Sequence, residues 1–313
     1  MIHNEKTLQL KSILYNPLIL KEKIKGAFLL FILVFSVFIT FSSNSFSSAI
    51  FIRMCALAIS AVGVDILVHQ SGLVTMGSGG FFGIGGYCAA ICITSFTNLN
   101  LFTKSFLSFF FCLLITLIIS LIFGFAVLKL KGDYLALCTL GLGEILKIFF
   151  ENLNITGGAK GIFGIEKYIS PFIAFLILLL SLTICFIYKK SNLGLLTRAV
   201  RDDETAAASL GIKTKKIKLI CFCFCSVICA LGGLVYASNA GFINPQDFTF
   251  SKSIDILAAV VLGGGKSSFN CIIAAFAIEY FAICFQSFSA YKMIIFGLIL
   301  IAISIIKSKR QKN

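Results

Sequence analysis

The sequence predicts an all-α polytopic membrane protein of about ten transmembrane or half-membrane helices. Of its 313 residues, 58% are hydrophobic and 13% are charged, and the mean hydropathy is +1.01. Soluble domains carry about 25% charged residues. Apolar runs close to the roughly 17–25 residues that cross a bilayer recur along the chain. The net charge of +14 needs no nucleic-acid partner, because basic residues beside anionic membrane lipid account for it.

Ten apolar segments define the predicted helices. A basic segment, 1–26, precedes them, the membrane domain is 27–306, and a basic tail, 307–313, follows. With a cytoplasmic amino terminus, twenty of the 27 Lys and Arg residues fall on the cytoplasmic side, eight of them in the loop 189–218. The positive-inside rule therefore predicts that both termini are cytoplasmic. The ten segments are 27–41, 49–69, 72–96, 105–130, 133–150, 171–188, 219–238, 253–264, 268–286 and 291–306.

Two of these segments differ from the rest. Segment 72–96 carries seven glycines, and segment 253–264 is too short to span as a regular helix and runs into glycines. Glycine-interrupted segments at matching places in two halves are typical of an internal repeat, here a pseudo-repeat around a transport pathway. Close helix packing through small residues explains them equally well. On the first alternative, the candidate pathway residues are Gly77, Gly79, Gly80, Gly83, Glu144, Gly263 and Gly264.

Motifs that would indicate an enzyme fail when their spacing is checked. GGGKSS at 263–268 is similar to a nucleotide-binding loop, but that motif requires glycine where this chain has Val260. The cluster near residue 80 gives no GxGxxG, because Phe82 takes the place of the third glycine. With only His3 and His69 in the chain, no Ser or Cys nucleophile has an evident base. The twelve cysteines show no CxxC spacing, so packing is favoured over a metal site. We predict a chain that is no enzyme and binds no metal or cofactor.

Acidic residues inside apolar runs need an explanation, because charge in hydrocarbon is costly. Asp65 and Asp255 lie near segment ends, where exposure at the membrane interface is expected. Glu144 lies well inside 133–150, and Lys147 shares its helical face. Glu144 is then either a polar group on the pathway, a lock between helices, or half of a structural ion pair.

The loop Glu151–Ile165, ENLNITGGAKGIFGI, is glycine-rich and lacks an apolar period. Such a loop either caps a pathway or receives a partner, or is simply a flexible connection. Its candidate docking residues are Thr156, Gly157 and Gly158.

The stretch 198–218, RAVRDDETAAASLGIKTKKIK, is polar in an otherwise apolar chain. Three acids suit the start of a helix, the alanines favour its middle, and Gly211 with the lysines after it suits its end. A short helix with small side chains and a charged rim fits a groove on another protein. A helix lying at the lipid headgroups is the alternative, although its apolar face is weak. The candidate contact residues are Arg198, Arg201, Asp202, Asp203, Glu204, Ala206, Ala207 and Gly211.

Four sequence blocks follow one another in a fixed order. They are GLVTMGSGGFFGIGGYCAA from Gly72, TLGLGEILKIFFENLNITGGAKGIFGI from Thr139, SNLGLLTRAVRDDETAAASLGI from Ser191 and GFINPQDFTFSKSIDILAAVVLGGGKSSF from Gly241. Together they resemble the permease subunits of branched-chain amino-acid ABC importers of the LivM type. The resemblance covers about Ala56 to Phe281 and implies an ABC importer permease fold in a bacterial inner membrane.

This resemblance also implies a function and partners. The chain is expected to be a transport subunit for branched-chain or other small aliphatic amino acids, driven by ATP and Mg on separate cytoplasmic ATP-binding subunits. The stretch 198–218 is then the coupling helix seated on that ATPase. A second, LivH-like permease subunit is implied, and so is an extracytoplasmic solute-binding protein that docks near 152–170 and 239–252. Two places depart from the family pattern: Thr205 stands where a Glu is usual, and Lys266 is added to the last glycine turn.

Two alternatives stay open from the sequence. Related permeases for urea, amides or other small solutes look alike at this level. An ion-coupled secondary transporter or a channel is a different class, and it would have no use for the polar helix at 198–218.

Overall fold

A computed structural model of the chain describes residues 45–96, 100–130, 132–265 and 267–284. The apolar segments 27–41 and 291–306 and both basic terminal segments lie outside these ranges. The chain divides into two compact units, residues 1–48 and 49–313. The helices and sites below lie in the second unit, apart from the first residues of α3.

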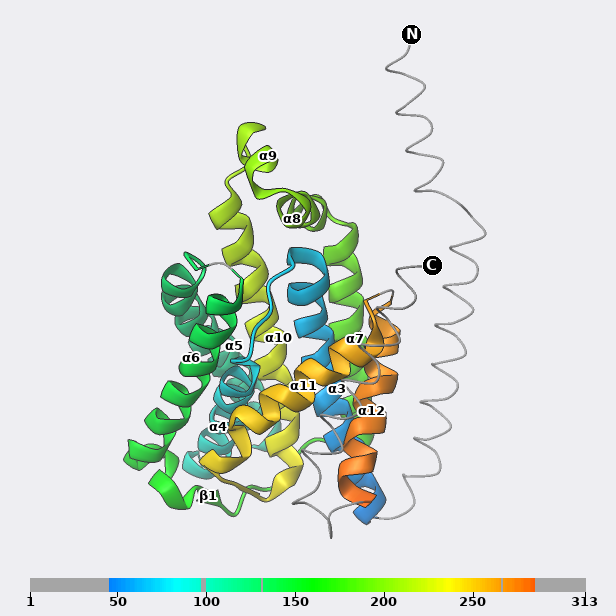
Figure 1. The fold of residues 1–313 in the computed structure, drawn as a ribbon. Coiled ribbons are helices and arrows are strands. Elements are labelled where there is room, and N and C mark those ends of the chain that lie inside the picture. Colours follow the sequence, from blue (N-terminus) through cyan, green and yellow to red (C-terminus); the bar gives the residue numbers. More distant parts are fainter. Residues whose placement is uncertain (1–44, 97–99, 131, 266, 285–313) are drawn as a thin grey trace. The chain divides into compact units, whose positions relative to one another are not determined.

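The described residues form ten α-helices joined by short connections (Figure 1). Eight of them coincide with the eight apolar segments predicted within these ranges, and five are long and apolar enough to cross a membrane: α3, α4, α5, α7 and α10. The total of ten segments and the pseudo-repeat stay predictions. The ten described helices are α3 (Ser45–Ser71), α4 (Ser78–Ser95), α5 (Leu101–Val127), α6 (Asp133–Asn152), α7 (Pro171–Lys190), α8 (Asn192–Asp202), α9 (Glu204–Ser209), α10 (Thr214–Ala240), α11 (Phe250–Gly263) and α12 (Ser268–Cys284).

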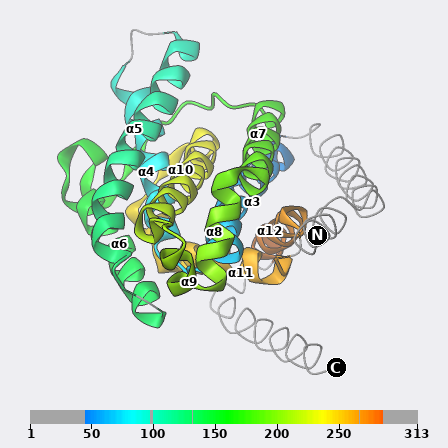
Figure 2. The same ribbon diagram turned by 90° about the horizontal axis from the view of Figure 1, so that it is seen from above.

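Helices α4 and α10 pack along each other at the centre of the second unit, with α5 and α6 on one side and α3 and α7 on the other (Figure 2). Small residues permit this close approach. A Cβ atom added to Gly85 of α4 would collide with the backbone of Ala230, and one added to Gly233 of α10 would collide with the backbone of Phe82. Close packing through glycine is how helices associate where lipid supplies no hydrophobic driving force.

Helix α5 reverses the polarity of a helix in water. Its exposed positions are mostly Phe, Leu and Ile, whereas its buried positions from Lys104 to Gly124 recur at every fourth residue and are small or polar. A helix that faces hydrocarbon on one side and other helices on the other has this pattern. The buried positions are Lys104, Ser108, Cys112, Thr116, Ser120, Gly124 and Val127.

The two glycine-rich segments differ in the structure: segment 253–264 forms a helix too short to span, as its length predicted, whereas α4 runs unbroken through five glycines and the predicted break there is wrong. Residues 72–77 are not helical, and α4 begins only at Ser78. Helix α11 has 14 residues and ends at Gly263; the next residue, Gly264, has a φ of +71°, which favours glycine. The two segments meet inside the membrane domain, where the Gly79 N–H donates to Ser253 Oγ at 2.8 Å.

The connections at the end opposite α9 pair with each other (Figure 1). Strand β1 (Ile162–Phe163) is antiparallel to β2 (Phe242–Ile243), with Ile162 opposite Ile243. Three 3₁₀ turns flank them: η1 (Asn154–Thr156), η2 (Gly158–Lys160) and η3 (Pro245–Phe248). The two loops predicted to receive a partner, 152–170 and 239–252, therefore lie side by side.

Candidate functional site

The stretch 198–218 forms two helices and the start of a third, not the single short helix that was expected. Arg198, Arg201 and Asp202 belong to α8, and α9 follows after one residue, Asp203. Gly211, with φ of +83°, lies in the turn after α9. Lys215, Lys216 and Lys218, which were expected beyond a helix end, follow the end of α9 and lie in the first turns of α10.

Asp203 fixes the start of α9. Its Oδ1 accepts hydrogen bonds from the Thr205 N–H at 2.8 Å, the Thr205 hydroxyl at 2.6 Å and the Ala206 N–H at 3.0 Å. Together these donors hold the pKa of the Asp203 carboxyl below its ordinary value, because they favour the charged form. Of the three consecutive acids, Asp203 is thus the N-cap that the sequence pattern predicted for this region.

Apolar packing beneath α9 holds the two short helices to α10. Val200, Ala207 and Ile217 form a small buried cluster, and Lys218 Nζ lies 2.8 Å from Glu204 Oε1. Ala207, which was predicted to contact a partner protein, is only 3% exposed and packs against Val200 and Ile217. The outward face of α9 and the residue after it consists of Ala206, Ala208, Ser209 and Leu210.

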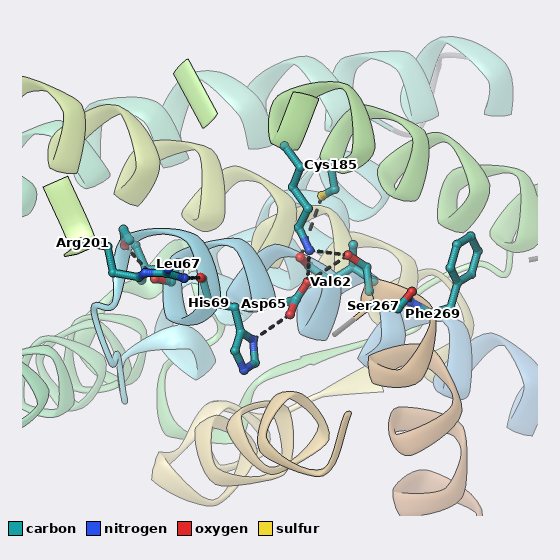
Figure 3. Close-up of polar contacts among 11 residues, drawn as sticks. Val62, Asp65, Leu67, His69, Cys185, Arg201, Ser267 and Phe269 are labelled. Carbon is teal, nitrogen blue, oxygen red and sulfur yellow. Dashed lines mark hydrogen bonds and ion pairs between the residues drawn. The ribbon is translucent and has the colours of Figure 1, made fainter. Parts of the chain in front are cut away.

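Two arginines tie α8 to the ends of the membrane helices. The Arg201 Nη1 group donates to the backbone oxygen of His69 in α3 at 2.6 Å (Figure 3). The Arg198 Nη2 group donates to the backbone oxygen of Lys189 in α7 at 3.0 Å. Any displacement of α8 therefore pulls directly on the last turns of α3 and α7.

The last turns of α3 and α7 carry a buried polar group whose burial was not expected from the sequence. Asp65 is 0% exposed, so the expected exposure at the membrane interface is wrong; Asp255, at 8%, is also buried. Asp65 accepts from Lys189 Nζ at 2.5 Å and from the Ser268 hydroxyl at 2.8 Å, and its other oxygen lies 2.8 Å from His69 Nδ1. These four residues, the Asp65 network, join α3, α7 and α12; Figure 3 shows Asp65 and His69.

Five of the six glycines predicted for the pathway lie where another part of the chain approaches closely, which bears out close packing. At these five positions the Cβ atom of any larger residue would meet a neighbouring group. The sixth glycine, Gly264, instead has a left-handed φ. Whether they also line a pathway stays a prediction. The neighbours are Thr139 at Gly77, Ser253 at Gly79, Gly143 at Gly80, Phe248 at Gly83 and Cys271 at Gly263.

The ion pair predicted for Glu144 is present. Glu144 Oε2 lies 3.7 Å from Lys147 Nζ on the same helix, and Lys147 also lies 3.8 Å from Glu151. The Glu144 side chain is 37% exposed at the surface of α6. A role on the pathway stays a prediction for this residue.

The glycine-rich outer loop is held by its own hydrogen bonds. The buried Thr156 hydroxyl donates to the backbone oxygens of Phe150 and Leu153, at 2.5 and 2.7 Å. Gly157 and Gly158 both have positive φ, which lets the chain turn sharply here. This loop is built as a defined surface beside β1 and β2.

A comparison of the sequence with known protein families identifies the family of this chain. The profile of the family described as "Branched-chain amino acid transport system / permease component" matches residues 46–304. The chain belongs to this permease family. The permease is thus an integral membrane protein and a transport component, and the matched relatives are named as transport proteins.

Individual relatives show how far the similarity reaches. The permease is 34% identical over 278 residues to the high-affinity branched-chain amino acid transport system permease protein LivM of Escherichia coli (strain K12), covering 76% of this chain and 63% of that protein. The alignment thus takes in less than two thirds of that relative's length. Identity to LivM of Salmonella typhimurium is 33% over 309 residues, or 86% and 71% of the two chains. The autoinducer 2 import system permease protein LsrC of Photorhabdus luminescens is 36% identical over 96 residues, or 31% and 28%. No solved structure matches the chain significantly.

Proposed function

We propose that this permease is the membrane subunit of an ATP-driven ABC importer for branched-chain or other small aliphatic amino acids. The observation that carries the proposal is the α8–α9 pair, a small-residue helix at one end of the domain that is bonded through Arg201 and Arg198 to α3 and α7. An ion-driven transporter or a channel has no use for such a pair. ATP and Mg act on separate ATPase subunits that seat α9, in the inner membrane with α9 on the cytoplasmic side.

Alternating access then follows from the connections of the α8–α9 pair. A push on α9 reaches the end of α3 through Arg201 and His69, and the same turn of α3 holds Asp65. From Asp65 the movement passes to α7 through Lys189 and to α12 through Ser268. Helices packed through glycine slide past one another with few side chains to repack.

The opposite end of the domain suits a docking partner. Loops 152–170 and 239–252 are joined by the β1–β2 pairing; Gly157 is exposed in this surface, Gly158 is half-buried, and the buried Thr156 holds the loop through its hydrogen bonds. A ligand-loaded solute-binding protein docks there, and a second, LivH-like permease subunit completes the pathway. The names of the LivM relatives favour branched-chain amino acids as substrates.

The test places charge on the outward face of α9. Ala206→Arg and Leu210→Glu alter exposed side chains, whereas a substitution at buried Ala207 would disturb the fold. In the reconstituted complex we expect both variants to lose the ATPase on co-purification and to lose ATP hydrolysis stimulated by the loaded binding protein. Ala206→Ser keeps the small volume and is the matched control.

Two outcomes would contradict the proposal. One is full stimulated hydrolysis in both charged variants. The other is uptake of L-leucine by the purified chain alone in vesicles that contain no nucleotide, which is the result expected of the ion-driven class.

A further inference from the structure

A second buried ion pair lies near the β1–β2 end, away from the Asp65 network. Lys252 Nζ of α11 lies 3.5 Å from Glu279 Oε2 of α12, and the two side chains are only 13% and 10% exposed. Removing two ions from water costs several kcal/mol each, and their mutual attraction repays this only with good geometry. A pair that is long for a hydrogen bond is therefore a poor structural lock. Glu279 lies inside the apolar helix α12, and ionisable residues inside apolar membrane segments are more often functional.

Two aromatic rings lie beside the lysine of this pair. Lys252 Nζ lies 5.4 Å from the ring centroids of both Phe82 in α4 and Tyr236 in α10. The Phe248 ring centroid lies 5.9 Å from that of Phe82 and 6.3 Å from that of Tyr236, so the three rings form one cluster, which we call the aromatic box. The guanidinium of Arg53 lies 5.8 Å from the Tyr236 centroid. The box thus combines apolar walls with ring faces that attract cations.

The position of the box connects it to the moving parts of the permease. Lys252 lies on α11 and Phe82 on α4, the two glycine-rich segments, which are bonded to each other at Gly79 and Ser253. A shift of either segment changes the distance between the lysine and its ring faces. The ion pair is therefore placed where a relative movement of α4 and α11 would change its surroundings.

We propose that Lys252, Glu279 and the aromatic box bind the zwitterionic head group of an α-amino acid during its passage. The substrate carboxylate pairs with Lys252, the substrate ammonium pairs with Glu279 and the ring faces, and the aliphatic side chain packs on the rings. Because the pair and the zwitterion are each neutral overall, no charge is left unpaired before or after binding. Urea and amides have no formal charges and cannot replace either partner. This inference rests on the proposed function and names its substrate class.

Saturation-transfer NMR on the assembled transporter in nanodiscs, without binding protein or nucleotide, tests the site directly. The probes are L-leucine, isovalerate, which has only the carboxylate, and isopentylamine, which has only the ammonium. We expect the native protein to bind L-leucine and to bind neither single-charge probe comparably. Lys252→Met and Glu279→Gln each leave one buried charge unpaired and should weaken L-leucine binding roughly thirtyfold. Lys252→Arg keeps the cation and should retain binding.

Lys104→Met is the matched control, because Lys104 is a buried lysine that lies 3.9 Å from Glu166, a carboxylate outside the box. It should leave L-leucine binding unchanged. Unchanged binding in Lys252→Met and Glu279→Gln overturns the proposal, as does the absence of L-leucine binding by the native protein. If the Lys252 and Glu279 variants fail to fold, the native protein still tests the proposal. Binding of isovalerate or isopentylamine by the native protein, as strong as its binding of L-leucine, overturns the proposal.

The NMR result is independent of ATPase coupling, which separates this inference from the proposed function. Native import of L-leucine with unaltered binding in the variants refutes the site alone. Loss of binding in the variants, with stimulated ATP hydrolysis intact in Ala206→Arg and Leu210→Glu, refutes the coupling role alone.

Discussion

Replacing Asp65 by Asn removes the charge at the centre of the Asp65 network. Asp65 is fully buried and accepts from Lys189 at 2.5 Å and Ser268 at 2.8 Å. The substitution leaves the Lys189 ammonium without its charged partner, and breaking a buried pair in this way costs about 3–5 kcal/mol. In a chain of this length, such a loss lowers the midpoint of thermal unfolding by on the order of 10 °C.

The buried cysteines of the permease can be used to measure its thermal unfolding. Of the eleven cysteines whose side chains the structure describes, ten are buried and Cys138 is exposed. A thiol-reactive fluorescent dye therefore reports unfolding in detergent as the buried thiols become accessible, and Cys138→Ser removes the background from the exposed thiol. Each variant is compared in this Cys138→Ser background by its unfolding midpoint.

A double-mutant cycle shows whether the effect comes from the pair. In Asp65→Asn with Lys189→Met both charges are gone, so we expect the double variant to lose less stability than the two single losses added together, by about 1–3 kcal/mol. Asp133→Asn alters an exposed acid at the start of α6 and should cost under about 1 kcal/mol. Strict additivity, or an Asp65→Asn midpoint within error of native, refutes the reasoning.

Three further outcomes are expected. Because the pKa of Asp203 is lowered, its N-cap stabilises α9 fully above about pH 4, and this stabilisation is lost as the pH falls through the lowered pKa. Hydrogen exchange of residues 204–209 should show this loss in the native protein. Asp203→Asn caps the helix without titrating and should not show it. Gly263→Ala places a Cβ atom 2.7 Å from the Cys271 backbone nitrogen and should cost about 1–3 kcal/mol in the thiol assay, whereas Gly141→Ala enters open space and should not destabilise. Glu144→Gln breaks only a half-exposed pair within one helix and should change stability by under about 0.5 kcal/mol; a larger loss would mean that Glu144 locks α6 to another helix.

The spanning helices were predictable because their signal is local. Twenty or so apolar residues must pair their own backbone groups in lipid, so each apolar segment within the described residues became a helix. The glycine break at α11 was also visible, since Gly264 ends that helix through a conformation that few other residues adopt. Both predictions depend only on residues that are close together in the sequence.

The candidate site could not be predicted in the same way, because it depends on contacts between residues that are far apart in the sequence. Asp65 looks like an interfacial acid because its decisive partners, Lys189 and Ser268, lie 124 and 203 positions further along the chain. Ala206 and Ala207 are indistinguishable by propensity, yet one faces outward and the other packs on Ile217 of α10. No periodicity in a six-residue helix specifies which alanine is buried.

Helix α12 connects the two charged clusters. Its first residue, Ser268, bonds to Asp65, and Glu279 pairs with Lys252 eleven residues further on, about 16 Å along a regular helix. A helix of this length moves as one body, so a displacement large enough to break the Ser268 bond also stretches the Glu279 pair, which is already 3.5 Å long. On the proposed mechanism, force applied at α9 therefore reaches the amino-acid site through one rigid element, and the site's affinity changes when the Asp65 network opens.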